Sequence, residues 1–256
     1  MSNVKEYIRF RCEGQTHYGL VQGDKVSFLE GDLFANPVVT DHQAKLDQVQ
    51  LLAPCLPGKA VCVGLNYRRH AEELGMKLPD EPIIFLKPSD AVIGPNDAII
   101  YWPSIGQLDY ESELAIVIGK AGRDIPEQDA MDYVFGYTIA NDVTARDLQR
   151  KDGQWTRAKG FDTFLPVGPR IVAGIDASDL HLQAILNGQV KQDSRTSDMI
   201  FSIPQMISFV STVMTLYPGD LILTGTPSGI GPMRVGDTIE CVIEGLGRLV
   251  NTIGRP

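Results

Sequence analysis

The chain has 256 residues, of which 43% are hydrophobic and 21% are charged, a composition typical of a globular protein. This composition excludes a disordered chain, a collagen and a small disulfide-stapled scaffold. The 32 acidic residues outnumber the 23 basic ones and give a formal net charge of −9, which disfavours a nucleic-acid partner bound through a broad basic surface. A local basic pocket for a small anionic ligand remains compatible with this charge.

The cysteines and the N-terminus indicate the cellular setting. Cys12, Cys55, Cys62 and Cys241 form no CxxC pair and no zinc-binding spacing, so we expect reduced and mostly buried thiols. The start, MSNVKEYIRF, lacks the apolar core of a secretory signal, and no segment reaches the roughly 18 apolar residues of a membrane-spanning helix. We therefore expect a soluble cytoplasmic protein without a membrane partner.

Residues 5–30 predict a small β-meander. Ile8, Phe10 and Cys12 alternate with polar positions along one strand, and the sequences EGQ and GDK supply two turns. Residues 31–50 are polar and poorly periodic, and they predict no element. We place a domain boundary at the Ala53-Pro54 step, which gives a small N-terminal β-rich domain over 1–53 and a main domain over 54–256.

The main domain contains short apolar runs separated by Gly and Pro. These runs predict buried strands over residues 59–65, 83–88, 113–120, 134–142, 182–194, 220–226 and 238–253. Asn187-Gly188 is a strong signal for a hairpin turn within one of them.

A single long helix is predicted over residues 203–216. Ser202 is its N-cap, Pro204 suits its first turn, and Pro218-Gly219 follows its end. Its apolar stripe comprises Ile203, Met206, Ile207, Val210, Val213 and Met214. The chain has no phosphate-binding GxxxxGK[ST] motif, no GxGxxG after a strand and no GxSxG, so the fold class is mainly β with some α and the chemistry must lie elsewhere.

Carboxylates beside a core strand are the first chemical signal. In LDYESELAIVIG (108–119), Glu111 and Glu113 share a face with Asp109, because side chains two residues apart point the same way in a strand. Buried like charges repel unless a cation neutralises them, and a hard divalent cation prefers carboxylate oxygens. Asp142, at the end of a neighbouring strand, is a candidate third ligand; the alternative is a solvent-facing strand end with ordinary charges.

A histidine with a nearby carboxylate is the second signal. His70 lies in a helix-compatible run, so Glu73 at i+3 is its neighbour on one face. A carboxylate that fixes the imidazole tautomer is typical of a general base. The alternative is a surface helix in which Glu73 pairs with Arg69.

Further polar residues follow the carboxylates. Arg146 and Gln149 lie at +4 and +7 from Asp142, which puts all three on one helical face if the segment is helical. Lys159 precedes a loop rich in Gly and Pro, and Thr226 lies in a loop rich in backbone donors. Each residue alone fits a structural role better than a functional one, but together they offer donors to an anionic substrate next to a metal.

The order of these motifs resembles the fumarylacetoacetate hydrolase family, in particular its short bacterial-type members. The matching segments are GLNYRRHAEE (64–73), IFLKPSDAVIGP (84–95), LDYESELAIVIGK (108–120), YTIANDVTARDLQ (137–149), KGFDTFLPVGP (159–169) and LTGTPSGIGPM (223–233). They follow one another in the same order as in that family and span about 170 residues, from 64 to 233. The resemblance implies a rolled mixed β-sandwich catalytic domain, usually in a homodimer.

The resemblance also implies roles for individual residues. Glu111, Glu113 and Asp142 match the metal carboxylates, which hold Mg²⁺ or Mn²⁺. His70 and Glu73 match a catalytic pair on a lid segment, and Lys159 matches the catalytic lysine. Arg146, Gln149 and Thr226 match substrate-binding positions.

The expected substrate is a small 2-oxo acid. We expect hydrolysis of a C–C bond in an acylpyruvate-like acid, with a metal-stabilised enolate and His70 as the base for water. The same intermediate serves an isomerase of the 2-hydroxyhepta-2,4-diene-1,7-dioate type and an oxaloacetate decarboxylase, so the sequence leaves these alternatives open. A diketo-deoxy sugar acid is a further substrate alternative, and a non-catalytic metal-stabilised binding module is the alternative from another class. The lid over residues 73–82, with Arg146 and Arg157, is expected to contact the distal end of the substrate.

Overall fold

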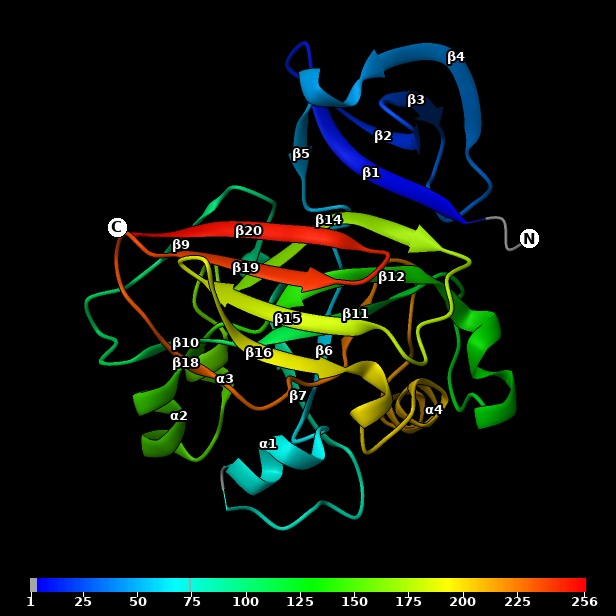
Figure 1. Cartoon of the computed structure of the whole chain (residues 1–256). Coiled ribbons are helices and arrows are strands. Elements are labelled where there is room, and N and C mark those ends of the chain that lie inside the picture. The colour runs from blue at the N-terminus through cyan, green and yellow to red at the C-terminus, as the bar shows by residue number, and fades with distance from the viewer. Residues whose placement is uncertain (1–3, 74) are drawn as a thin grey trace.

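The computed structural model describes residues 4–73 and 75–256, and β-strands dominate it (Figure 1). Within these residues the strands form sheets of twelve, three and five strands. The predicted class, mainly β with mixed sheets and some helix, is confirmed. Among the described residues, no helix has the length and apolar character needed to cross a membrane.

The N-terminal strands form the predicted meander and extend it. The strands are β1 (Lys5–Cys12), β2 (Gln15–Gln22), β3 (Lys25–Glu30), β4 (Val38–Lys45) and β5 (Gln50–Leu52). Their own core contains Ile8, Phe10, Val26 and Phe28. The sequence predicted no element over 31–50, and this was wrong: β4 pairs with β3, and β5 pairs with β1. No residue of β4 is buried, so the strand has no apolar alternation to detect.

The large sheet joins the N-terminal strands to the main body. Its other strands are β6 (Ala60–Gly64), β7 (Ile83–Lys87), β8 (Val92–Ile93), β11 (Ser112–Ile118), β12 (Val134–Asn141), β14 (Leu165–Ala173) and β17 (Leu221–Leu223). β1 pairs antiparallel with β14, with Tyr7 opposite Ile171. The N-terminal part thus shares a hydrogen-bonded sheet with the rest of the chain, and the domain boundary at residue 53 stays a prediction.

A five-stranded sheet packs on one face of the large sheet (Figure 1). Its strands are β9 (Ala98–Ile100), β15 (His181–Leu186), β16 (Gln189–Arg195), β19 (Thr238–Ile243) and β20 (Gly247–Gly254). Asn187 and Gly188 form the predicted hairpin turn, and both have positive φ, at 50° and 76°.

The central strand β11 is buried on both faces. Leu114, Ile116 and Ile118 belong to the core between the two sheets, whereas Ala115 and Val117 belong to a second core on the opposite face. Because side chains alternate along a strand, Glu113 lies on the second face with Ala115 and Val117. This orientation removes Glu113 from the apolar interior of the sandwich.

The three-stranded sheet is built from chain segments that leave the large sheet. Its strands are β10 (Leu108–Tyr110), β13 (Thr144–Ala145) and β18 (Gly231–Met233). Only Glu111 separates β10 from β11, and only residues 142–143 separate β12 from β13. Residues 224–230 likewise connect β17 to β18. Three neighbouring strands therefore each change sheet at one place, because β11 pairs with β12 and β17, and β10 pairs with β13 and β18.

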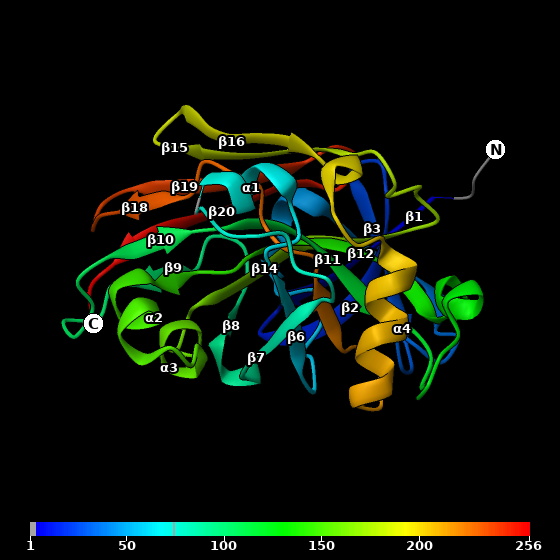
Figure 2. The same ribbon diagram turned by 90° about the horizontal axis from the view of Figure 1, so that it is seen from below.

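The helices lie on the side of the molecule seen in Figure 2. They are α1 (Arg68–Glu73), α2 (Arg146–Asp152), α3 (Thr156–Lys159) and α4 (Ile203–Val213). Ser202 caps α4 in a capping box with Gln205, as its sequence predicted. The helix ends before Met214, which adopts an extended conformation, so Val213 is 51% exposed instead of extending the apolar stripe. The four cysteines are free, and Cys12 is the one that is not fully buried.

Candidate active site

The three predicted metal carboxylates meet where the strands change sheet. Glu111 lies between β10 and β11, and Asp142 lies between β12 and β13. The backbone N–H of Asp142 donates to the Glu111 carbonyl at 2.8 Å, and the Glu111 N–H donates to the Asn141 side-chain oxygen at 2.9 Å. These two bonds hold the crossing strands together and fix the directions of the two acidic side chains.

The carboxylates form a compact and buried cluster. One oxygen from each of Glu111, Glu113 and Asp142 lies within 4.8 Å of the others. Each of the three residues is at most 5% exposed. Asp109, which the alternation rule placed on the same face, is not part of this cluster, because the strand is broken at Glu111 and Asp109 belongs to β10 in another sheet.

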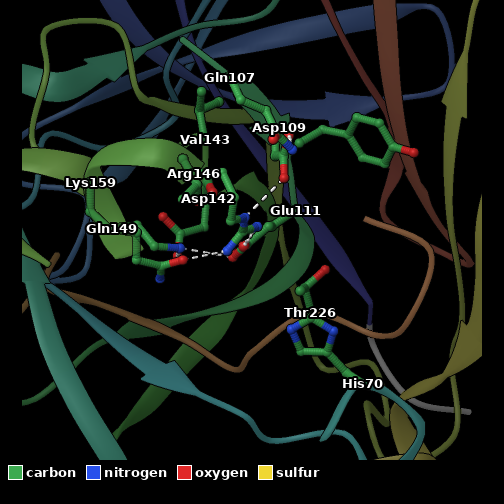
Figure 3. Close-up of polar contacts among 12 residues, drawn as sticks. His70, Gln107, Asp109, Glu111, Asp142, Val143, Arg146, Gln149, Lys159 and Thr226 are labelled. Carbon is green, nitrogen blue, oxygen red and sulfur yellow. Dashed lines mark hydrogen bonds and ion pairs between the residues drawn. The ribbon is translucent and has the colours of Figure 1, made fainter. Parts of the chain in front are cut away.

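Two buried lysines contact the cluster. The Lys159 ammonium donates to Glu111 Oε2 at 2.8 Å and to Asp142 Oδ2 at 2.6 Å (Figure 3). The Lys87 ammonium donates to Asp142 Oδ1 at 2.7 Å and to the Val143 carbonyl at 3.0 Å. Lys87 has no role among the residues predicted from the sequence, although a lysine at the end of the apolar run IIFLKP was a usable signal of a buried charge that needs a partner.

Arg146 connects the cluster to its surroundings. Its Nε donates to Asp109 Oδ2 at 2.9 Å, its Nη1 donates to Gln149 Oε1 at 2.6 Å, and its Nη2 donates to Glu111. The shared helical face of Asp142, Arg146 and Gln149 depended on a helical segment from Asp142 onward, and this condition is not met, because α2 begins only at Arg146. The two-residue strand β13 lies between Asp142 and the helix.

Charge is unevenly distributed within this network. Burial alone would raise the pKa of Glu111, but the charges of Lys159 and Arg146 outweigh it and hold that pKa well below its usual range. Burial and the neighbouring charges of Asp142 and Glu111 raise the pKa of Glu113 well above its usual value. The one hydrogen bond that Glu113 accepts from the described residues comes from the Gly225 N–H, at 2.8 Å. Glu113 is therefore the carboxylate whose charge is least compensated by the protein.

The donor set fits a hard divalent cation. Four buried carboxylates (Asp109, Glu111, Glu113 and Asp142) face three buried cations (Lys87, Arg146 and Lys159), which leaves an excess of negative charge beside Glu113. Carboxylate oxygens are the ligands that Mg²⁺ and Mn²⁺ prefer, and no thiol or imidazole belongs to the described cluster. Glu111, Glu113 and Asp142 are thus the residues that can hold such an ion.

The His70–Glu73 pair lies on α1 across from the carboxylates. His70 is 5% exposed, and its Nδ1 is 3.0 Å from Glu73 Oε2. The other Glu73 oxygen accepts a hydrogen bond from the Gly229 N–H at 3.0 Å, which ties α1 to the loop between β17 and β18. This arrangement fixes the imidazole orientation and leaves Nε2 directed toward neither Glu73 nor Gly229.

Thr226 belongs to the same loop but has its hydroxyl engaged. Its Oγ1 donates to the Ser112 carbonyl at 3.0 Å and accepts from Gln192 Nε2 at 2.7 Å. Gln192, which is fully buried, also accepts from the Ser112 N–H. Gln192 could not be found from the sequence, because a glutamine in the outer strand of a hairpin carries no signal of burial.

One cavity of about 370 Å³ unites these groups. Eight of the nine predicted site residues line it, and the ninth, Glu73, contacts His70. The remainder of the lining is largely apolar and comprises Val63, Gly64, Leu65, Met76, Phe85, Arg150 and Trp155. Arg157 does not line it, since its guanidinium pairs with Asp152 on the surface. The roles of the nine residues stay predictions, but the structure brings them to one place.

Comparisons with known proteins agree with this arrangement. Residues 59–254 match the family described as fumarylacetoacetate (FAA) hydrolase C-terminal, and residues 6–54 match the family described as Rv2993c-like, N-terminal. An uncharacterized protein of Archaeoglobus fulgidus is 51% identical over 245 residues, which cover 95% of this chain and 94% of that protein.

Two further relatives carry descriptive names. The mitochondrial oxaloacetate tautomerase Fahd2a of Rattus norvegicus is 44% identical over 218 residues, which cover 80% of this chain and 70% of that protein. The crystal structure of a 2-hydroxyhepta-2,4-diene-1,7-dioate isomerase from Mycobacterium marinum superposes with a TM-score of 0.92 at 44% identity, over 98% of both chains. One family match covers most of the chain, and relatives from several organisms are 44% identical or more. This chain therefore belongs to the fumarylacetoacetate hydrolase family.

Proposed function

We propose that the protein is a divalent-metal-dependent enzyme that interconverts the enol and 2-oxo forms of a small 2-oxo acid. The observation that carries the proposal is the placement of the buried carboxylate cluster and the His70–Glu73 pair on the same cavity. Relatives named as an oxaloacetate tautomerase and a hydroxy-dienedioate isomerase support this class of reaction. Both named reactions move a proton between an enol oxygen and a carbon.

The carboxylate cluster is the part of the cavity that would bind the carboxylate and 2-oxo end of the substrate. A Mg²⁺ or Mn²⁺ ion held by Glu111, Glu113 and Asp142 would supply Lewis-acid chemistry to the carboxylate and 2-oxo oxygens of the substrate. Lys159 remains fully charged there: burial alone would lower its pKa, but Asp142 and Glu111 raise it above its usual value. A permanent ammonium at this position stabilises negative charge that develops on the 2-oxo oxygen.

His70 is the group that can move the proton. Its imidazole faces the cavity from α1, and Glu73 fixes its orientation through Nδ1. The free Nε2 can take a proton from the enol hydroxyl or from the carbon next to the 2-oxo group and return it to the other position. The apolar wall around Phe85 and Trp155 limits competing proton exchange with solvent.

Hydrolysis of an acylpyruvate-like acid is the second candidate. The same His70–Glu73 pair favours it, because an imidazole held in a fixed orientation can also take a proton from water attacking the distal carbonyl. Decarboxylation of oxaloacetate and cleavage of a diketo-deoxy sugar acid need the same binding end. The reactions differ in whether a C–C bond breaks. Hydrolysis and decarboxylation break a C–C bond at the carbon that carries the negative charge in the enolate, whereas tautomerisation only moves a proton to or from carbon.

An ultraviolet assay separates these reactions. Purified protein would be treated with EDTA, reconstituted with Mg²⁺ or Mn²⁺, and given the enol form of oxaloacetate, a 2-hydroxy-dienedioate and acetylpyruvate. The proposal expects metal-dependent loss of enol absorbance from the first two without release of CO₂. Turnover of acetylpyruvate alone, with acetate and pyruvate as products, would replace it by the hydrolase, and metal binding without any turnover would contradict both.

A further inference from the structure

The cations that line the cavity differ in how fully they are engaged. Lys159 donates to two carboxylates, and the three terminal groups of Arg146 contact Asp109, Glu111 and Gln149. Both side chains are buried, and they are committed to the metal end of the site. Their positive charges are therefore already balanced by carboxylates at that end of the cavity.

Among the described residues, Arg150 is the cavity-lining cation that has no hydrogen-bond or ion-pair partner. It lines the cavity, its side chain is exposed, and no hydrogen bond or ion pair engages its guanidinium. It follows Arg146 by one turn of α2, which separates the two β-carbons by about 5–6 Å on one helix face. The cavity therefore extends from the buried, neutralised Arg146 to an unpaired guanidinium at the solvent side.

The remaining lining shows what a distal group would meet. Apart from the polar groups already engaged, it comprises Val63, Leu65, Met76, Phe85 and Trp155. These side chains offer no counter-charge to an anionic group. A second carboxylate on the substrate has one available cation at the solvent side, and a guanidinium matches a carboxylate with two parallel hydrogen bonds.

We propose that Arg150 binds the distal carboxylate of a dicarboxylic substrate and so makes the enzyme prefer dicarboxylic over monocarboxylic 2-oxo acids. The inference rests on the proposed function and specifies its substrate class. Arg157, which the sequence favoured for the distal end, cannot serve, because it pairs with Asp152 and lies outside the cavity lining.

Arg150→Gln tests this assignment against the matched control Lys151→Gln. Lys151 is the next residue of the same helix, is exposed, and does not line the cavity, so its replacement changes net charge equally. For a dicarboxylic substrate such as 2-hydroxyhepta-2,4-diene-1,7-dioate, Arg150→Gln is expected to raise KM about tenfold, with a much smaller change in kcat. For the monocarboxylic 2-hydroxypenta-2,4-dienoate, KM should stay within about twofold of the wild-type value in both variants.

A binding measurement keeps the inference separate from the reaction. Manganese-loaded protein would be titrated calorimetrically with 2-oxoglutarate and with 2-oxobutyrate, which differ in the distal carboxylate. A selective loss of 2-oxoglutarate affinity in Arg150→Gln supports the role of Arg150 even if the proposed reaction fails in the kinetic assay. Equal changes for both ligands, or no change for either, overturn the inference, as would an equal effect of Lys151→Gln.

Discussion

Replacing Glu113 by glutamine tests the charge balance of the site most directly. Glutamine keeps the size of the side chain and an oxygen that can accept the Gly225 N–H, but it removes the charge. We expect Glu113→Gln to be more stable than the wild type without metal and to lose the stabilisation that a divalent cation gives. Most substitutions of a buried charged residue destabilise a protein, so this result would be diagnostic.

The expected magnitude follows from the cluster geometry. Two unit charges 4.8 Å apart, the outer limit of the cluster, repel by about 3.5 kcal/mol at an effective dielectric constant of 20. Glu113 experiences this repulsion from Glu111 and Asp142, and attraction to Lys159 offsets about one of the two interactions. Because the raised pKa of Glu113 allows partial protonation, a net gain of about 1–2 kcal/mol is expected for the metal-free variant, or about 2–8 °C in Tm.

The metal-dependent part is measured in the same thermal unfolding experiment. At a free metal concentration of about 100 times Kd, binding stabilises the wild type by about 2.7 kcal/mol, which corresponds to about 5–10 °C. Glu113→Gln should show a shift near zero at that concentration. Asp220→Asn is the matched control, since Asp220 is equally buried but pairs with Lys59 outside the cluster.

Asp220→Asn and Glu113→Gln should change metal-free stability and the metal-induced shift in Tm in opposite ways. Asp220→Asn should lose stability without metal, because the buried Asp220 carboxylate loses its ion pair with the partly exposed Lys59, and it should keep the full metal-induced shift. A wild-type metal shift in Glu113→Gln would refute the ligand assignment. A metal-free Glu113→Gln less stable than the wild type would refute the electrostatic reasoning and leave the ligand assignment standing.

The remaining predictions concern the base, a buried lysine and a helix cap. His70→Ala should lower kcat by about 10²–10⁴ and leave the metal-induced Tm shift unchanged, since His70 lies outside the carboxylate cluster; an altered shift would make it a metal ligand. Lys87→Met should weaken metal affinity about 10–100-fold in a calorimetric titration, because Asp142 loses one of the two lysines that orient it; wild-type affinity would contradict this role. Ser202→Ala should cost about 1 kcal/mol in urea unfolding, with turnover unaffected, because the α4 cap is lost.

The sequence predicts most of the elements for a simple physical reason. The strands of the main body are buried, so apolar runs and turn residues mark them clearly, as in β11 and the hairpin at Asn187-Gly188. β4 escapes because it is an edge strand without buried side chains, and its pairing with β3 is a tertiary effect. The end of α4 is misplaced for the related reason that Val213 is apolar but exposed.

The candidate site is predicted less completely, because its partners come from distant segments. The chemistry of Glu111, Glu113 and Asp142 can be inferred from their types and spacing. The contacts of Lys87 and Gln192 cannot, since each depends on a residue at least 34 positions away. The four-residue spacing of Asp142 and Arg146 also suggested a common helix. The two-residue strand β13 between them is too short to leave an alternating pattern of apolar residues in the sequence.

The position of the site follows from the change of sheet at three neighbouring strands. A strand that leaves one sheet for another interrupts its ladder, and the backbone groups at the interruption need other partners. Here the crossings satisfy one another: Asp142 donates to Glu111, Glu111 donates to Asn141, and Gly225 donates to Glu113. The same interruption turns acidic side chains out of the packed sandwich and into a cavity. A cluster of like charges is thereby held by rigid backbone, and the repulsion that this geometry preserves is what gives the site its affinity for a divalent cation.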